Sequence, residues 1–205
     1  MSDVERPQIY LLSPPAFALD AFTGLLQRVL DASPVACFRL AMATRDEGDV
    51  CRAADALREI LHARDIPIVI ADHLLLAERL GLDGVHLSDG ARRVRKAREK
   101  LQKDAIVGAF CGASRHDGLT AGEAGADYVS FGPVGPTALG DGTVAERELF
   151  AWWSEMIELP VVAEGGLTAE VVADLAPITD FFGIGEEIWS QDDPVAALVH
   201  LTQGL

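Results

Sequence analysis

The sequence predicts a single (β/α)8 barrel domain spanning residues 1–205, in which eight parallel strands form a closed ring inside a ring of helices. Short apolar runs alternate eight times with longer segments of helical periodicity, and this alternation favours a barrel. The runs are almost continuously apolar, as expected of parallel strands that are covered on both faces. The first run ends at Leu12–Pro15 without any glycine, so the glycine-rich turn of a dinucleotide-binding sheet is missing.

The expected elements follow one another along the whole chain. The eight strands are expected at Gln8–Ser13, Ala36–Met42, Pro67–Ala71, Gly84–Ser88, Ala105–Cys111, Tyr128–Val134, Pro160–Glu164 and Phe181–Gly185. The helices are expected at Ala18–Ala32, Asp49–Arg64, Asp72–Leu80, Arg93–Gln102, Leu119–Ala124, Val144–Ile157, Thr168–Leu175 and Pro194–Leu201. Asp49 and Thr168 are side chains of the type that caps a helix N-terminus, and Pro194 suits a first helical turn.

Composition excludes several classes of protein. With 205 residues, of which 49% are hydrophobic, the chain can bury a core and is not expected to be disordered. No apolar stretch approaches the ~20 residues of a membrane span, and the start Met1–Arg6 is polar, unlike a signal peptide. Three cysteines without a CxxC pair make a disulfide framework or structural zinc improbable, so a cytoplasmic location is expected.

The charge balance restricts the partners. With 17 basic and 32 acidic residues, the formal net charge is -15. General binding to nucleic acid or to an anionic membrane needs a positive field and is not expected. The expected partner is a small-molecule phosphate ligand, held locally by backbone N–H groups and a few arginines. Whether the chain forms a homo-oligomer is left open.

Three polar residues at strand ends are candidates for the site, because barrel active sites lie at the carboxyl ends of the strands. Arg39 either binds an anion in the barrel mouth or pairs with Asp72 or Glu164. Asp72 either binds a metal or caps the following helix. His86 either takes part in ligand binding or catalysis, or is a satisfied core histidine.

Two loops carry further candidates. Asp89 follows the fourth strand and could reach the mouth, whereas the basic run after it, Arg92 to Lys103, is interpreted as a solvated helix face. His116 follows the fifth strand, close to Cys111, a pairing that weakly suggests an activated thiolate.

Two adjacent glycines predict an anion-binding site at the carboxyl end of the seventh strand. Gly165 and Gly166 follow the seventh strand directly before a helix, where consecutive bare N–H groups can hold a phosphate. Thr137, in the loop after the sixth strand, offers a hydroxyl to the same phosphate. The loops after the seventh and eighth strands are the usual phosphate site of barrels.

Four segments resemble one family. They are Gly84–Leu87, Gly125–Val129, Gly132–Thr137 and Val161–Gly166. The sequence is similar here to thiamine phosphate synthase and its thiazole tautomerase relatives, whose fold is also a (β/α)8 barrel. The resemblance implies a transferase of thiamine biosynthesis that joins hydroxymethylpyrimidine diphosphate to thiazole phosphate with Mg²⁺ and releases pyrophosphate. The alternatives are an isomerase of the tautomerase kind and a non-catalytic relative that binds a phosphate ligand.

The resemblance also implies roles for single residues. Arg39, Asp72 and His116 match the catalytic set, the last of them loosely. Arg39, His86, Thr137, Gly165 and Gly166 match the binding set, and Asp72 with Asp89 the metal set. The family's polar, metal-binding and lysine positions fall here on Cys37, Ala41, Ala91 and Gly140. These replacements predict weak, substrate-dependent Mg²⁺ binding and low or absent turnover, because a diphosphate leaving group needs neutralising charge.

Overall fold

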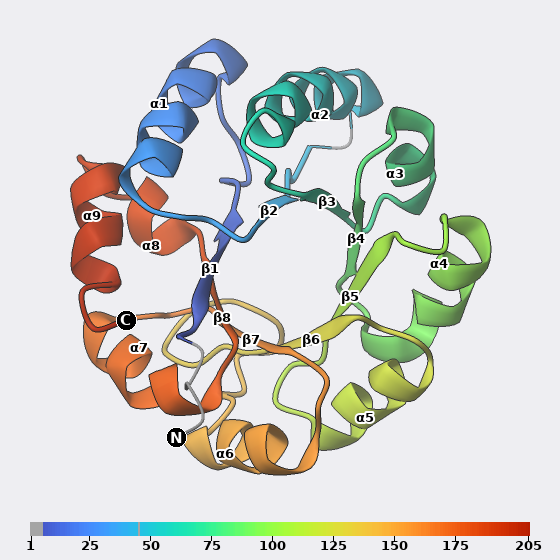
Figure 1. Cartoon of the computed structure of the whole chain (residues 1–205), viewed down its shortest axis with the longest axis vertical. Coiled ribbons are helices and arrows are strands. Elements are labelled where there is room, and N and C mark those ends of the chain that lie inside the picture. Colours follow the sequence, from blue (N-terminus) through green and yellow to red (C-terminus); the bar gives the residue numbers. More distant parts are fainter. Residues whose placement is uncertain (1–5, 45) are drawn as a thin grey trace.

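The strands close into the predicted barrel. The computed structural model describes residues 6–44 and 46–205, and its strands pair in parallel in the order β1-β2-β3-β4-β5-β6-β7-β8, with β8 returning to β1 (Figure 1). The strands are β1 (Gln8–Leu12), β2 (Cys37–Leu40), β3 (Ile68–Ala71), β4 (Gly84–Leu87), β5 (Ile106–Phe110), β6 (Tyr128–Phe131), β7 (Val161–Glu164) and β8 (Phe181–Ile184). All eight predicted strands are therefore confirmed.

The helices surround the barrel as predicted, with shifted ends. They are α1 (Leu19–Ala32), α2 (Glu47–His62), α3 (Leu74–Leu80), α4 (Val94–Lys100), α5 (Arg115–Glu123), α6 (Arg147–Met156), α7 (Ala169–Leu175), α8 (Glu186–Trp189) and α9 (Pro194–Leu201). Short 3-10 turns, η1 (Gly90–Arg93) and η2 (Ala176–Ile178), precede α4 and follow α7. The sequence analysis did not predict α8, which lies directly after β8.

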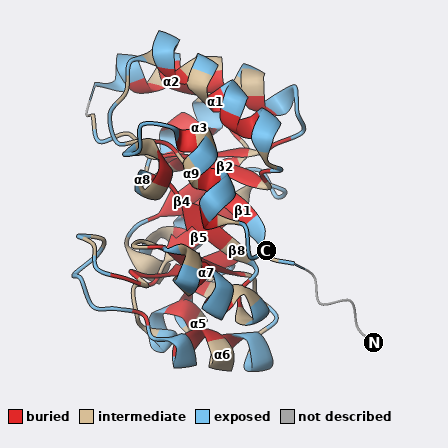
Figure 2. Ribbon diagram, turned by 90° about the vertical axis from the view of Figure 1, so that its left-hand side faces the viewer, coloured by how far each residue is buried: buried red, intermediate tan, exposed pale blue. Residues whose placement is uncertain are grey.

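The main core lies between the strands and the helices (Figure 2). Residues such as Leu11, Phe38 and Ile70 are almost completely buried there. Alternation along each strand sends the neighbouring side chains into the barrel interior. A smaller apolar cluster fills the barrel interior toward the amino ends of the strands. It consists of Tyr10, Cys37, Val69, Tyr128 and Val162. No helix among residues 6–44 and 46–205 is long and apolar enough to cross a membrane.

Two helix caps differ from the prediction. Asp46, not Asp49, caps α2 and accepts a hydrogen bond from the N–H of Asp49. Asp72 does not cap α3, because its carboxylate accepts a hydrogen bond from the N–H of Ser88, at the end of the neighbouring strand, at 3.0 Å. Thr168 caps α7 as predicted.

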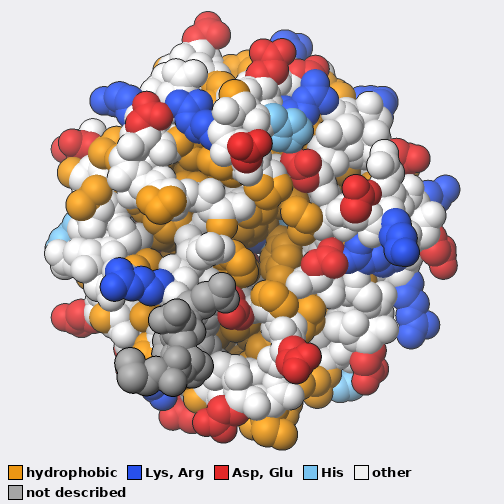
Figure 3. Space-filling model, in the orientation of Figure 1, with side chains coloured by type: hydrophobic (Ala, Val, Ile, Leu, Met, Phe, Trp, Pro, Cys, Tyr) orange, Lys and Arg blue, Asp and Glu red, His pale blue; other side chains and the backbone are white. Residues whose placement is uncertain are grey.

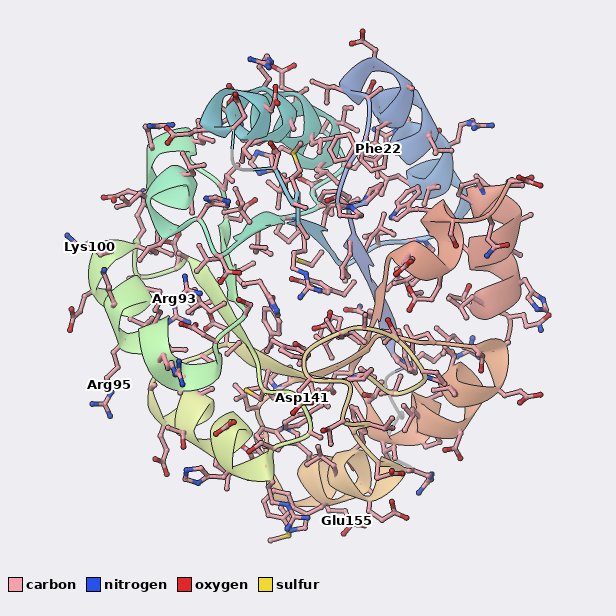
Figure 4. All side chains as sticks on the ribbon, turned by 180° about the vertical axis from the view of Figure 1, so that it is seen from behind. Phe22, Arg93, Arg95, Lys100, Asp141 and Glu155 are labelled. Carbon is pink, nitrogen blue, oxygen red and sulfur yellow. The ribbon has the colours of Figure 1, made fainter. Side chains whose placement is uncertain are left out.

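The two ends of the barrel differ in chemistry. Figure 3 shows a hollow lined by hydrophobic side chains in the centre of the face seen in Figure 1. A cavity of about 240 Å³ at the amino ends of the strands matches this hollow, and Tyr10, Cys37 and Val162 are among its lining residues. The carboxyl ends open on the opposite face, where the loop that carries Asp141 lies in front of the barrel (Figure 4). The predicted site residues belong to this second end.

Candidate active site

An ion pair spans the barrel interior near the carboxyl ends of the strands. The guanidinium of Arg39, on β2, donates two hydrogen bonds to the two carboxylate oxygens of Glu164, on β7. The two residues are only 5% and 2% exposed. Burial alone would lower the pKa of Arg39, but the carboxylate of Glu164 outweighs this effect and raises it. Of the two roles expected for Arg39, binding an external anion or pairing with a carboxylate of the protein, the structure shows the second.

Glycines make room for this pair. A Cβ atom at Gly183 would lie 2.8 Å from the Cβ of Glu164, and one at Gly132 would lie 2.1 Å from the Glu164 carbonyl oxygen. Neither position tolerates a side chain, so the strands on both sides of Glu164 are adapted to hold it. The Nε of Arg39 is buried without a hydrogen-bond partner among the described residues.

His86 joins the ion pair to two tyrosines. Its Nδ1 lies 2.8 Å from the hydroxyl of Tyr128, which lies 2.6 Å from the hydroxyl of Tyr10, and its Nε2 lies 4.0 Å from Glu164. Burial and, secondarily, the charge of Arg39 hold the pKa of His86 well below its ordinary value. His86 is therefore neutral at physiological pH, and its ring is fixed by the hydrogen bond at Nδ1.

Asp72 and Asp89 come together, as the metal prediction required, but a side chain lies between them. The guanidinium of Arg93 binds Asp72 and donates from Nε to Asp89 at 2.7 Å, and Figure 4 shows it on the inner side of α4. Burial alone would raise the pKa of Asp72, but hydrogen bonds from Ser88 and Arg93 lower it. Arg93 is therefore not part of a solvated helix face, which corrects the interpretation of the basic run.

This arrangement does not fit a metal ion. Both carboxylates already hold a cation, and within the described ranges no group of three or more His, Cys, Asp or Glu side chains has the arrangement of a metal site. A divalent ion would have to displace Arg93 before it could reach Asp72 and Asp89. The weak, substrate-dependent binding of Mg²⁺ stays a prediction.

The glycine pair forms a cradle of N–H groups, and a carboxylate fills it. The N–H groups of Gly166 and Leu167 donate to Oε1 of Glu187 at 3.1 and 3.3 Å, and that of Gly185 donates to Oε2 at 2.9 Å. The cradle therefore combines the loops after β7 and β8, with Gly166 but not Gly165 among its donors, and phosphate binding by the glycine pair stays a prediction. An anion does bind it, but that anion belongs to the protein.

The loop after β6 packs against the cradle. The N–H groups of Val134 and Gly135 both donate to the carbonyl oxygen of Gly165, at 2.8 and 3.2 Å. A Cβ atom at Gly165 would approach the methyl group of Thr137 to 3.3 Å. Thr137 thus lies beside the glycine pair, and the contact of its hydroxyl with a phosphate stays a prediction.

His116 lies apart from the buried network. It is exposed near the start of α5 and lines a cavity of about 930 Å³, together with Arg92, Arg95 and Cys111 among others. Burial and then the charge of Asp117 raise the pKa of Cys111 to about 12, so this thiol is not activated. The catalytic role of His116 stays a prediction.

Sequence reasoning missed three members of the site. Tyr128 could have been found from its alternation with Ser130 on β6, which points both side chains into the barrel. Arg93 could not be distinguished from the other basic residues of the run Arg92 to Lys103. Glu187 could not be placed in the cradle from the sequence, because its position there depends on the short helix α8, which was not predicted.

A family model and two curated relatives point to one family. A family model described as thiamine monophosphate synthase matches residues 9–179. Thiamine-phosphate synthase of Rhodospirillum centenum is 40% identical over 94% of this chain and 94% of its own length. Thiamine-phosphate synthase of Erythrobacter litoralis is 39% identical over 96% of this chain and 95% of its own length.

A solved structure shows the same fold. Thiamine phosphate pyrophosphorylase from Pyrococcus furiosus superposes with a TM-score of 0.83 at 22% identity, over 96% of this chain and 94% of that one. The resemblance seen in the four motifs is thereby confirmed along nearly the whole chain. The chain belongs to the thiamine monophosphate synthase family.

Proposed function

We propose that the protein joins hydroxymethylpyrimidine diphosphate to thiazole phosphate and releases pyrophosphate, with a low turnover. The observation that carries this proposal is the cradle of N–H groups from Gly166, Leu167 and Gly185 at the barrel mouth, in a chain of this family. Such a cradle suits the monophosphate of the thiazole substrate.

The diphosphate needs a separate, positively charged position. The cavity of about 930 Å³ at the carboxyl ends of the strands is lined by two arginines, Arg92 and Arg95, and also by three aspartates. The two arginines are its candidates to neutralise a leaving pyrophosphate. Arg115, another candidate, stacks on the ring of Trp152, with 4.1 Å between its Cζ and the ring centre. We therefore assign the pyrophosphate to Arg92 and Arg95.

The buried network supplies position rather than chemistry. Arg39 is paired with Glu164, and neutral His86 is held by Tyr128. These contacts fix the floor of the mouth, so that substrates meet a rigid surface.

The low turnover follows from charge. Four positions that are polar, acidic or basic in the family are occupied here by Cys37, Ala41, Ala91 and Gly140. Loss of a single preorganised electrostatic donor typically costs ~10²–10³ in rate. The direct test is pyrophosphate release by the purified protein with both substrates and Mg²⁺, with each substrate alone as the control. We expect turnover well below the order of 1 per second that is ordinary for enzymes, and a further fall in Arg92→Ala. Turnover at ordinary rates would contradict the low rate.

A second candidate is a binding protein without turnover. It is favoured by the internal pairing of both inward-facing arginines, Arg39 with Glu164 and Arg93 with Asp72 and Asp89. Saturable binding of thiazole phosphate without any pyrophosphate release would establish this candidate and exclude the synthase.

A further inference from the structure

We propose that Glu187 is an internal competitor for the phosphate cradle, so that a phosphate-bearing ligand binds only after this carboxylate has left. The inference deepens the proposed function, because the cradle is where the thiazole phosphate is expected to bind. Glu187 would then set the affinity of the site for phosphate.

The glycine pair of the cradle is held by backbone contacts that do not involve Glu187. Gly165 and Gly166 have φ angles of +81° and +76°, which favour glycine. A Cβ atom at Gly166 would lie 2.6 Å from the backbone of Gly135. The loops after β6 and β7 are thus locked together by backbone packing. Removing the Glu187 side chain should leave the N–H groups of the cradle in place.

The occupant, in contrast, has room to move. Glu187 belongs to the four-residue helix α8 and is partly exposed. It also lines a cavity of about 520 Å³ together with Thr168, Gln191 and Asp193, among others. A change of side-chain rotamer into this cavity would free the three N–H groups without moving the backbone.

A phosphate is chemically suited to replace this carboxylate. Both are anions that accept charge-assisted hydrogen bonds from N–H groups, but a phosphate offers more oxygens and more negative charge. The two cannot share the cradle, because like charges at hydrogen-bond distance repel strongly. The apparent dissociation constant of phosphate is therefore its intrinsic value divided by the fraction of molecules in which the cradle is empty.

The test is calorimetric titration of inorganic phosphate into the wild-type protein, Glu187→Ala and Glu186→Ala. Glu186 is the neighbouring carboxylate and is exposed, so it is the matched control. We expect Glu187→Ala to bind phosphate at least about tenfold more tightly than the wild type, as an empty fraction of a tenth or less would require. Glu186→Ala should bind like the wild type.

Two outcomes would overturn the proposal. One is equal affinity of the wild type and Glu187→Ala for phosphate, and the other is failure of a folded Glu187→Ala to bind phosphate at all. If Glu187→Ala does not fold, Glu187→Gln takes its place, because it keeps the shape and an acceptor oxygen but loses the charge. Since no substrate is used, this result is independent of whether pyrophosphate is released.

Discussion

In the fold, the guanidinium of Arg39 is paired with the carboxylate of Glu164, and its role toward a ligand stays a prediction. An arginine within an apolar strand is expected to bind an anion, and it does, but the anion is a carboxylate on the opposite side of the barrel. Breaking such a buried pair costs more than the pair itself contributes, because one charge is left without a partner.

Arg39→Met should therefore destabilise the protein by about 3–5 kcal/mol in the absence of ligand. Urea unfolding curves of the wild type and the variant measure this difference. The double variant Arg39→Met/Glu164→Leu removes both charges and should recover most of the loss. A single variant as stable as the wild type would show that Glu164 does not depend on Arg39.

The low pKa of His86 makes a second prediction, on pH dependence. The folded protein holds His86 neutral beside Arg39, Glu164, Tyr128 and Tyr10, whereas the unfolded chain protonates it near its ordinary value. Below about pH 6.5 the unfolded state binds more protons, so stability falls as the pH falls, by about 1.4 kcal/mol at pH 5.5 from this residue.

The measurement is the free energy of unfolding of the wild type and of His86→Gln at pH 7.5 and pH 5.5. The variant should lose less stability than the wild type between these two values. Equal losses in both proteins would contradict a neutral, buried His86.

At the scale of elements, the loops after β6 and β7 depend on glycine in two distinct ways. Gly166 and Gly142 have similar φ angles, +76° and +81°. Only Gly166 also packs against backbone, that of Gly135, whereas a Cβ atom at Gly142 would meet nothing within 4 Å. Substitutions at Gly166 and Gly142 therefore distinguish the energetic cost of the backbone conformation from the energetic cost of close packing.

Gly142→Ala should cost roughly 1–2 kcal/mol for the left-handed conformation alone. Gly166→Ala should cost about 2–5 kcal/mol, because overpacking adds to the same strain. Thermal and urea unfolding of the two variants provide the comparison. Equal losses would mean that the two loops are not locked together.

The turn η1 makes a prediction about metal binding. Its last residue, Arg93, holds Asp72 and Asp89, and these are the two carboxylates that the resemblance assigns to Mg²⁺. We expect the free wild-type protein to bind Mg²⁺ weakly, and Arg93→Ala to bind it more tightly, because two carboxylates then lack a cation. Calorimetric titration of Mg²⁺ tests this, with Arg92→Ala as the control. Tight binding by the wild type would contradict the prediction.

At the scale of the whole molecule, the net charge of -15 opposes the approach of the anionic ligands that the mouth is proposed to bind. Salt screens this repulsion, since the Debye length falls from ~30 Å at ~10 mM to ~10 Å at ~100 mM ionic strength. The association rate of thiazole phosphate, measured by stopped-flow fluorescence, should therefore rise with salt over this range. A rate that falls would show that a local positive field at the mouth dominates the net charge.

The barrel could be predicted because its signal is local and repeated. Each strand is a short, almost continuously apolar run and each helix has an apolar stripe, so the alternation recurs eight times along the sequence. The glycine pair at Gly165 and Gly166 was also predictable, since its place after the seventh strand fixes its end of the barrel. The ends of helices were less predictable, as the cap at Asp46 shows, because neighbouring polar residues compete for the same role.

The partners of charged residues were decided by the tertiary structure alone. Closure of the sheet brings Glu164 to Arg39, 125 residues apart, and the turn after β4 carries Arg93 to Asp72. Glu187 reaches the cradle only through the short helix α8, which has no clear periodicity of its own. The sequence by itself determined which elements form and which end of the barrel holds the site. The three-dimensional arrangement determined which charges meet there, because electrostatic pairing depends on distances in space and the sequence records only distances along the chain.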